Sequence, residues 1–294
     1  MEMGLSDKTN KMIEKLNKLD SLPIMPEVAS KLLKMSRDPE TMPEDIAAVV
    51  ETDPAIVAQV MHYASSPWYG FKGEINSVKD AIFSILGMDM VTNMALGMAV
   101  GKVFTNKVEG KLSAKNLWLH SVYCAGLSEA LARAMPVRFH VKPGSAYLSG
   151  LLHNIGFMIM AHCFPDDFLA LSNEVETNHG ATIIDSERKI YGLTHAEVGA
   201  DLMHQWDLPE KVIHVMRHHH DEHYEGKFQH DVLLVQLANR IMANMDIGDE
   251  TNIEFDNELL ETLGISKEAV DSIVETMFSK HASELDKMAT LLAA

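Results

Sequence analysis

The sequence predicts an all-α protein. Nearly every periodic segment repeats its apolar residues at helical spacing, and no convincing run alternates apolar and polar residues as a half-buried strand does. Helix-start signals also recur, among them Asp53 followed by Pro54, and Ser77 three residues before Asp80. These observations favour a chain built from helices throughout.

The first part of the chain predicts four helices in order. One covers about 28–36, after the turn-like stretch LPIMPE, and the next begins at Pro43, whose acidic neighbours suit the positive end of a helix dipole. Asp53 is a good N-cap for the third helix, which has an apolar stripe. Ser77 opens the fourth in a capping-box pattern, and Gly87 is a natural helix stop.

A polar stretch, 105–116, separates this part from the rest of the chain. Of the 15 histidines, only His62 precedes the stretch, and the other fourteen lie at or after His120. We therefore divide the chain into an N-terminal helical lobe, 1–110, and a His-rich helical lobe, 111–294, and expect the two lobes to pack together.

Two later segments complete the expected His-rich lobe. The segment 143–165 carries no formal charge and is long enough to span a membrane, which takes about 20 residues. Its serine, histidine and asparagine side chains and its flanking prolines instead favour a buried helix of a soluble protein. The amphipathic stretches within 229–294 predict helices that extend this lobe and do not form a third domain.

The net charge of the chain disfavours some classes of partner. The chain has 25 basic and 42 acidic residues, a formal net charge of −17, which disfavours nucleic-acid and membrane-surface partners. Cys124 and Cys163 form no CxxC pair, so we expect reduced thiols. The first residues show no apolar signal-peptide core. We therefore expect a cytoplasmic location.

Several histidines are candidate site residues. His120 shares a helical face with Cys124 and therefore points inward. His153 and Asn154 interrupt the apolar run YLSGLLHNIGFMIMA, where a buried polar group without a partner costs roughly 1–3 kcal/mol. His195 lies near a helix start. Each has an ordinary interpretation as a hydrogen-bonded core residue or a first-turn residue.

A further cluster occurs in VIHVMRHHHDEH. It contains His219 and His220 and is followed by Asp221. Such a run is either a solvated surface turn or the source of one or two metal ligands. The residues alone leave both interpretations open.

The order of these histidines along the chain resembles the HD superfamily of metal-dependent phosphohydrolases. In that superfamily a histidine, a His-Asp pair, further histidines and a final aspartate converge on one or two divalent metals. The resemblance matches His120 to the first histidine, His153-Asn154 to the pair and Asn239 to the final aspartate. It matches the extra histidines to His195, His219 and His220, with Asp221 after them.

Five ordered stretches resemble the HDOD domain family more specifically. They are DPAIVAQVMHYASSPWYG, INSVKDAIFSILG, LSGLLHNIG, THAEVGADLMHQWDLP and the HHH run, which together cover about residues 22–221. The resemblance implies an HD-like all-α fold and a bacterial signal-transduction output or adaptor domain. It also implies an eroded metal site and no assigned activity, since most members of the family share both properties.

Both positions that should carry metal-binding carboxylates hold amides, Asn154 and Asn239. An amide oxygen is a neutral and weaker donor than a carboxylate. The leading hypothesis is therefore a non-catalytic regulatory module with a vestigial metal site and no cofactor, acting on a signalling protein in trans or a small signalling ligand. The alternative is a metal-dependent phosphohydrolase of a nucleotide or phosphodiester, with iron, zinc, manganese or nickel held by the histidines.

The two hypotheses share one structural expectation. The side chains of His120, His153, Asn154 and Asn239 should converge in one buried cluster, because each lies on an inward helix face or in an apolar run.

Overall fold

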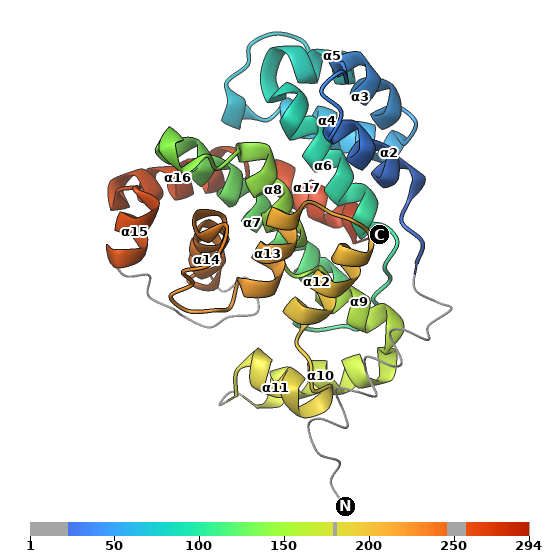
Figure 1. Ribbon diagram of the computed structural model, residues 1–294, viewed down its shortest axis with the longest axis vertical. Helices are drawn as coiled ribbons and strands as arrows, with labels where there is room; N and C mark the ends of the chain where they lie inside the picture. The colour runs from blue at the N-terminus through green and yellow to red at the C-terminus, as the bar shows by residue number, and fades with distance from the viewer. Residues whose placement is uncertain (1–22, 179–180, 246–256, 294) are drawn as a thin grey trace, which may run out of the picture.

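The computed structural model describes residues 23–178, 181–245 and 257–293. Within these ranges the chain forms helices and no strand, which confirms the all-α prediction (Figure 1). The N-terminal lobe comprises α2 (Glu27–Ser36), α3 (Pro43–Val50), α4 (Pro54–Ala64), η1 (Pro67–Tyr69), α5 (Val78–Ala81), η2 (Ile82–Leu86) and α6 (Gly87–Gly101). The remaining helices are α7 (Ala114–Ala134), η3 (Val137–Phe139), α8 (Pro143–Leu152), α9 (Ile155–Cys163), α10 (Pro165–Thr177), α11 (Ile183–Ile190), α12 (His195–Gln205), α13 (Glu210–His218), α14 (Gln229–Ala243), α15 (Asn257–Leu263), α16 (Lys267–Lys280) and α17 (Ala282–Leu292).

The predicted helix starts of the N-terminal lobe are present. The Asp53 carboxylate accepts hydrogen bonds from two backbone N–H groups of the first turn of α4, at 3.0 and 3.2 Å. The Ser77 hydroxyl accepts from the backbone N–H of Asp80 at the start of α5. Gly87 has a φ of 78°, and α6 begins there without an intervening loop. Local capping chemistry therefore sets these boundaries.

The lobes meet along α6, α7 and α8. Figure 1 shows α2–α6 at one end of the molecule, α10 and α11 at the opposite end, and α7, α8 and α12 between them. Helix α8 packs against both α6 and α7. A continuous cluster of buried apolar side chains extends from Ala29 in α2 to Ala289 in α17, so both lobes contribute to one core.

Two apolar segments have the length of a membrane span. Val78–Gly101 is long and apolar enough to cross a membrane, with a mean hydropathy of 1.4 over its most apolar 18 residues. However, 61% of that stretch is buried inside the protein, as in a core helix. The segment 143–165 is buried as expected, yet it is not a single helix. The chain breaks at His153 and Asn154, where Asn154 has φ −101° and ψ 13°, and continues as α9. Because of this break, α8 packs against α6 and α7, whereas α9 packs against α10 and α12.

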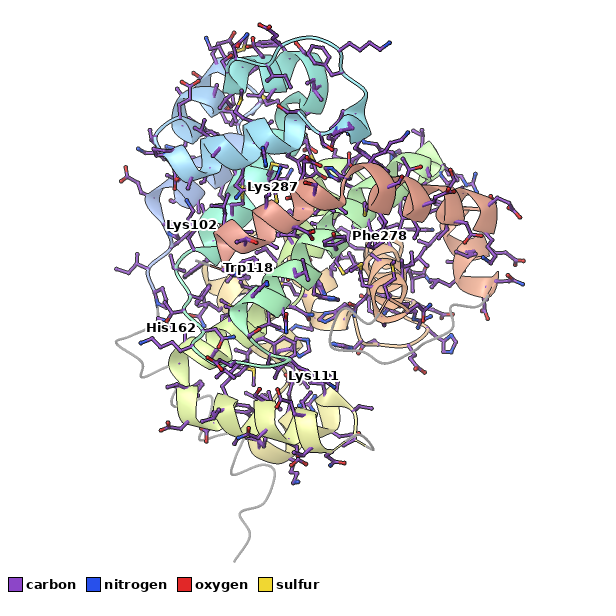
Figure 2. The ribbon with its side chains drawn as sticks, turned by 180° about the vertical axis from the view of Figure 1, so that it is seen from behind. Lys102, Lys111, Trp118, His162, Phe278 and Lys287 are labelled. Carbon is purple, nitrogen blue, oxygen red and sulfur yellow. The ribbon has the colours of Figure 1, made fainter. Side chains whose placement is uncertain are left out.

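The C-terminal helices contact both lobes. Helix α17 packs on α7 and also on α4, and α16 contacts α7 and η1. Figure 2 shows α17, marked by Lys287, crossing between the N-terminal lobe and α7. The sequence predicted that this region would extend the His-rich lobe, and the structure adds this second set of contacts.

A buried histidine lies where the C-terminal helices meet the N-terminal lobe. His281, between α16 and α17, is 1% exposed, and its Nδ1 is hydrogen-bonded to the hydroxyl of Ser66. Its ring packs edge-on against Tyr63 and stacks on Trp68. Burial lowers the pKa of His281 from 6.5 to about 4, because the charged imidazolium loses its hydration.

A candidate metal centre of histidines and a cysteine

Close helix packing brings the first site residues together. Helix α7 carries His120 and Cys124 one turn apart, and α8 crosses it at Gly150. A Cβ atom at Gly150 would lie 2.7 Å from the backbone oxygen of Cys124, which is closer than real Cβ contacts. Only glycine allows this approach. It places His153, three residues later, beside His120.

A second glycine positions the other histidines. A Cβ atom at Gly156 in α9 would lie 1.9 Å from the backbone oxygen of His195. The start of α12 therefore rests directly on α9. Thr194 caps α12 in a capping box, since its hydroxyl accepts from the backbone N–H of Glu197 and the Glu197 carboxylate accepts from the backbone N–H of Thr194. These contacts fix His195 in the protein interior.

The five candidate histidines form one connected cluster. Nε2 of His120 lies 3.1 Å from Nε2 of His153, whose ring meets that of His219 edge-on at 5.0 Å between centroids. Nε2 of His195 lies 3.2 Å from Nε2 of His219 and 3.2 Å from Nε2 of His220. His220 is half-buried, and the other four are at most 2% exposed. The predicted inward position of His120 and His153 is confirmed, whereas the sequence had left the positions of His195, His219 and His220 open.

The outer nitrogens show how two of the rings are protonated. Nδ1 of His153 lies 2.7 Å from the carbonyl oxygen of Gly150, and Nδ1 of His219 lies 2.6 Å from that of Met216. A carbonyl oxygen only accepts hydrogen bonds, so each Nδ1 carries the proton. The neutral ring then directs the Nε2 lone pair into the cluster. Metal-bound histidines are commonly oriented in this way.

Glu187 orients a third ring and was not predicted from the sequence. This residue of α11 is fully buried, and its Oε1 lies 2.8 Å from Nδ1 of His195 and 3.1 Å from the His195 backbone nitrogen. The His195 ring also stacks on Phe157, with 3.9 Å between centroids. Glu187 belongs to a short amphipathic helix rich in charged residues, and no motif marks it as buried. Its pairing with His195 depends on the fold.

The inner nitrogens of His195 and His219 face each other. Nδ1 of each ring faces an outer acceptor, so the neutral form of each ring would place a lone pair on Nε2, and these two atoms are 3.2 Å apart. Two lone pairs at this distance repel each other unless a proton or a cation lies between them. The arrangement therefore suits cation binding.

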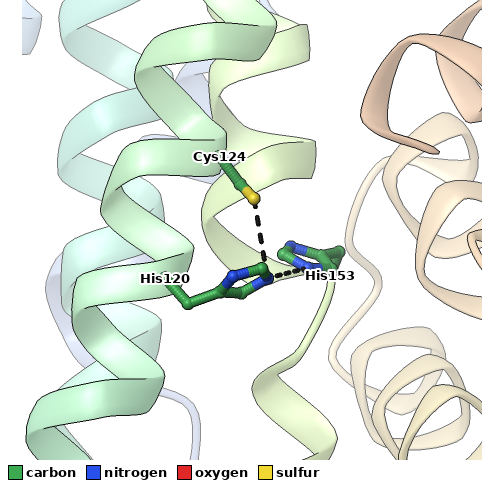
Figure 3. A group of neighbouring side chains, drawn as sticks. All are labelled: His120, Cys124 and His153. Atoms are coloured by element: carbon green, nitrogen blue, oxygen red, sulfur yellow. Dashed lines mark hydrogen bonds between the residues drawn. The ribbon is translucent and has the colours of Figure 1, made fainter. Parts of the chain in front are cut away.

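Two groups of three residues have the spacing of metal ligands. We call them the cysteine trio, His120, Cys124 and His153 (Figure 3), and the histidine trio, His195, His219 and His220. Within each trio the ligand atoms all lie within 4.8 Å of one another. Imidazole and thiolate donors suit zinc, iron, cobalt or nickel better than magnesium or calcium. The residues present thus fit a borderline divalent metal.

Cys124 was not among the predicted ligands. The sequence placed it on the same helical face as His120, four residues away, and this spacing was the available signal. Cysteine spacing alone predicted only a reduced thiol at this position.

Both amides at the positions matched to aspartates are buried. Asn154 is 2% exposed and Asn239, on α14, is 1% exposed, which confirms the predicted burial of both. Oδ1 of Asn239 lies 3.9 Å from Sγ of Cys124, so this residue reaches the cluster through the cysteine. Asp221, in contrast, is exposed and pairs with His218 at 2.6 Å. Its partner, His218, belongs to neither trio.

Comparison with known proteins identifies the fold family. The family model of the HDOD domain matches residues 22–222. The chain belongs to the HDOD domain family. This HDOD protein is 25% identical over 271 residues to an uncharacterized protein of Treponema pallidum (strain Nichols), covering 90% of the chain and 51% of that relative. It thus spans about half the length of the curated relative that it matches.

Solved structures agree with this assignment. An HDOD domain protein of unknown function from Geobacter sulfurreducens superposes with a TM-score of 0.76 at 23% identity, covering 98% of this chain and 99% of that one. A Marinobacter aquaeolei VT8 protein, provisionally named as acting in signal transduction, gives a TM-score of 0.77 at 25% identity, covering 99% of this chain and 66% of that one. A Shewanella amazonensis SB2B protein, provisionally named a phosphohydrolase, gives a TM-score of 0.72 at 22% identity, covering 95% and 97%.

Proposed function

We propose that this HDOD protein is a non-catalytic regulatory module of a bacterial signal-transduction pathway. It acts by binding a signalling protein or a small signalling ligand. Membership of the HDOD family and the signal-transduction name of the Marinobacter protein support this role. The observation that carries the proposal lies in the cluster itself. Neither trio contains a carboxylate, and the two positions matched to aspartates are buried amides, Asn154 and Asn239.

The missing carboxylates bear directly on hydrolysis. In the HD superfamily pattern that this chain resembles, carboxylate ligands balance the metal charge and orient the attacking water, and neither trio supplies one. Glu187 is buried nearby, but its Oε1 is hydrogen-bonded to the outer nitrogen of His195 and serves to orient that ring. A neutral amide supplies both a donor and an acceptor, which suits a structural core better than a hydrolytic centre.

A phosphohydrolase screen tests the proposal. Full-length protein without a His tag, supplied with manganese, iron or zinc, should not hydrolyse nucleotides, cyclic dinucleotides or model phosphodiesters above the buffer rate. The proposal fails if the parent turns over one of them and His153→Ala abolishes that turnover. His162→Ala is the matched control, because His162 lies on α9 but contacts Thr105, away from the cluster.

The same screen decides on a second candidate, a metal-dependent phosphohydrolase of a nucleotide or phosphodiester. The observation that favours it is the edge-on contact of His153 with His219, which sets the two trios side by side. The residues of both trios would hold the metal, and a divalent metal would supply Lewis-acid polarisation of a phosphoryl oxygen. Glu187 would keep His195 in the orientation that directs Nε2 inward.

A further inference from the structure

A sulfur atom completes the first trio. Cys124 lies four residues after His120 on α7, so both side chains lie on the side of the helix that faces His153 (Figure 3). Sγ of Cys124 lies 3.5 Å from Nε2 of His120, which lies 3.1 Å from Nε2 of His153. Cys124 and His153 are fully buried, and His120 is 2% exposed. The three ligand atoms thus share one enclosed space.

These separations match those of ligands around a single tetrahedral ion. Zinc bonds of about 2.0–2.1 Å to nitrogen and about 2.3 Å to sulfur imply nitrogen–nitrogen separations of about 3.3 Å and nitrogen–sulfur separations of about 3.6 Å. The observed 3.1 and 3.5 Å differ from these values by only a few tenths of an ångström. The remaining pair, Sγ of Cys124 and the ligand nitrogen of His153, lies within 4.8 Å, so side-chain adjustment would let the three atoms surround one ion.

Charge balance assigns a specific role to the cysteine. His153 presents a neutral lone pair, because its Nδ1 proton is donated to Gly150, and Asn239 is a neutral amide. Two imidazoles leave both charges of a divalent ion uncompensated. Cys124 is the member of this trio that becomes an anion on losing its proton, and a thiolate is a strong ligand for zinc-like ions.

Asn239 is suited to support a thiolate. Its Oδ1 lies 3.9 Å from Sγ, while its buried Nδ2 has no hydrogen-bond partner among the described residues. The oxygen and nitrogen of an amide are nearly isosteric, and their assignment depends on the hydrogen-bond network. With the amide turned over, the unpartnered N–H group donates to the sulfur. A carboxylate at this position would instead repel a thiolate.

We propose that Cys124 is the anionic ligand of a zinc-class divalent metal ion, which it binds together with His120 and His153. Binding forms a metal–sulfur bond, and the thiol proton passes to solvent. The thiolate replaces the negative charge that a carboxylate would supply and selects soft or borderline metals. The inference goes beyond the regulatory role and holds whether or not the protein hydrolyses a substrate.

Cobalt(II) titration of the reduced, metal-free, full-length chain tests this inference, because thiolate–cobalt bonds absorb in the near ultraviolet and imidazole–cobalt bonds do not. The parent should develop this absorption to one equivalent of cobalt, and zinc should abolish it. Cys124→Ser should lose the band and bind zinc at least about tenfold more weakly. Cys163→Ser is the matched control and should behave as the parent, since Cys163 is the other cysteine of the chain and lies at the end of α9.

X-ray absorption of the zinc-loaded parent gives a second readout that needs no substitution, and it should show one sulfur ligand at about 2.3 Å. Three results would overturn the inference. In the first, the parent binds neither cobalt nor zinc. In the second, it binds them without the near-ultraviolet thiolate–cobalt band and without a sulfur ligand, as the histidine trio alone would. Alternatively, the band survives in Cys124→Ser and is lost in Cys163→Ser.

Discussion

The buried His281 should make the stability of the protein depend on pH. Its pKa is about 4 in the folded protein, because burial penalises the charged ring, and about 6.5 when the chain is unfolded. As pH falls below about 6.5, the unfolded chain takes up a proton that the folded protein does not. Folding stability contributed by the neutral ring is therefore present above pH 6.5 and lost progressively towards pH 4. At about 1.4 kcal/mol per pH unit, this loss is about 3 kcal/mol.

Urea unfolding measured by circular dichroism between about pH 7.5 and about pH 4 tests for this loss. His281→Asn lowers stability at neutral pH but cannot titrate, so its unfolding free energy should fall less steeply than that of the parent. His204→Asn removes an exposed histidine of α12 and should keep the slope of the parent. Parallel curves for the parent and His281→Asn would refute the argument, since other groups would then account for the whole pH dependence.

Two further predictions concern the site. Replacing Asn154 and Asn239 together by aspartate supplies two anionic oxygen donors, so manganese affinity should rise relative to the parent, and manganese should raise the thermal midpoint of the variant more. Without metal, the same variant should be less stable than the parent, because it buries two carboxylates. If manganese shifts the thermal midpoints of the variant and the parent equally, the predicted gain in metal affinity is contradicted. Gly156→Ala should lower the free energy of unfolding measured in urea by about 1–3 kcal/mol, because the added methyl group overpacks the contact with α12. Gly199→Ala should lower it less, since its Cβ would lie 3.2 Å from its nearest neighbour. Equal costs would show that α9 can move away from α12.

Helix content and most of the cluster were predictable because they depend on local pattern. Apolar spacing and capping residues such as Asp53 and Thr194 set the helices without reference to the rest of the fold. The inward positions of His120 and His153 were predicted from a helical face and from an apolar run. The order of the motifs then indicated the HDOD family, which the family model confirms.

Contacts that only the folded chain reveals account for what the sequence did not predict. Glu187 reaches His195 across the short turn between α11 and α12, and nothing in its own segment marks it as buried. The break after α8 gives no glycine or proline signal at His153-Asn154, so the pattern predicted one helix. The contact of His281 with Ser66 joins residues 215 positions apart. No spacing rule covers such a separation.

The path of α17 bears on how the two lobes can move relative to each other. This helix contacts α7 of the His-rich lobe and α4 of the N-terminal lobe, and so links the two lobes. A rotation of the lobes about their junction would have to slide α17 or pull His281 away from Ser66. Helix α17 and His281 lie outside residues 22–222, the part of the chain that the HDOD family model matches. In this chain the relative position of the lobes therefore depends on a segment that the family model does not cover.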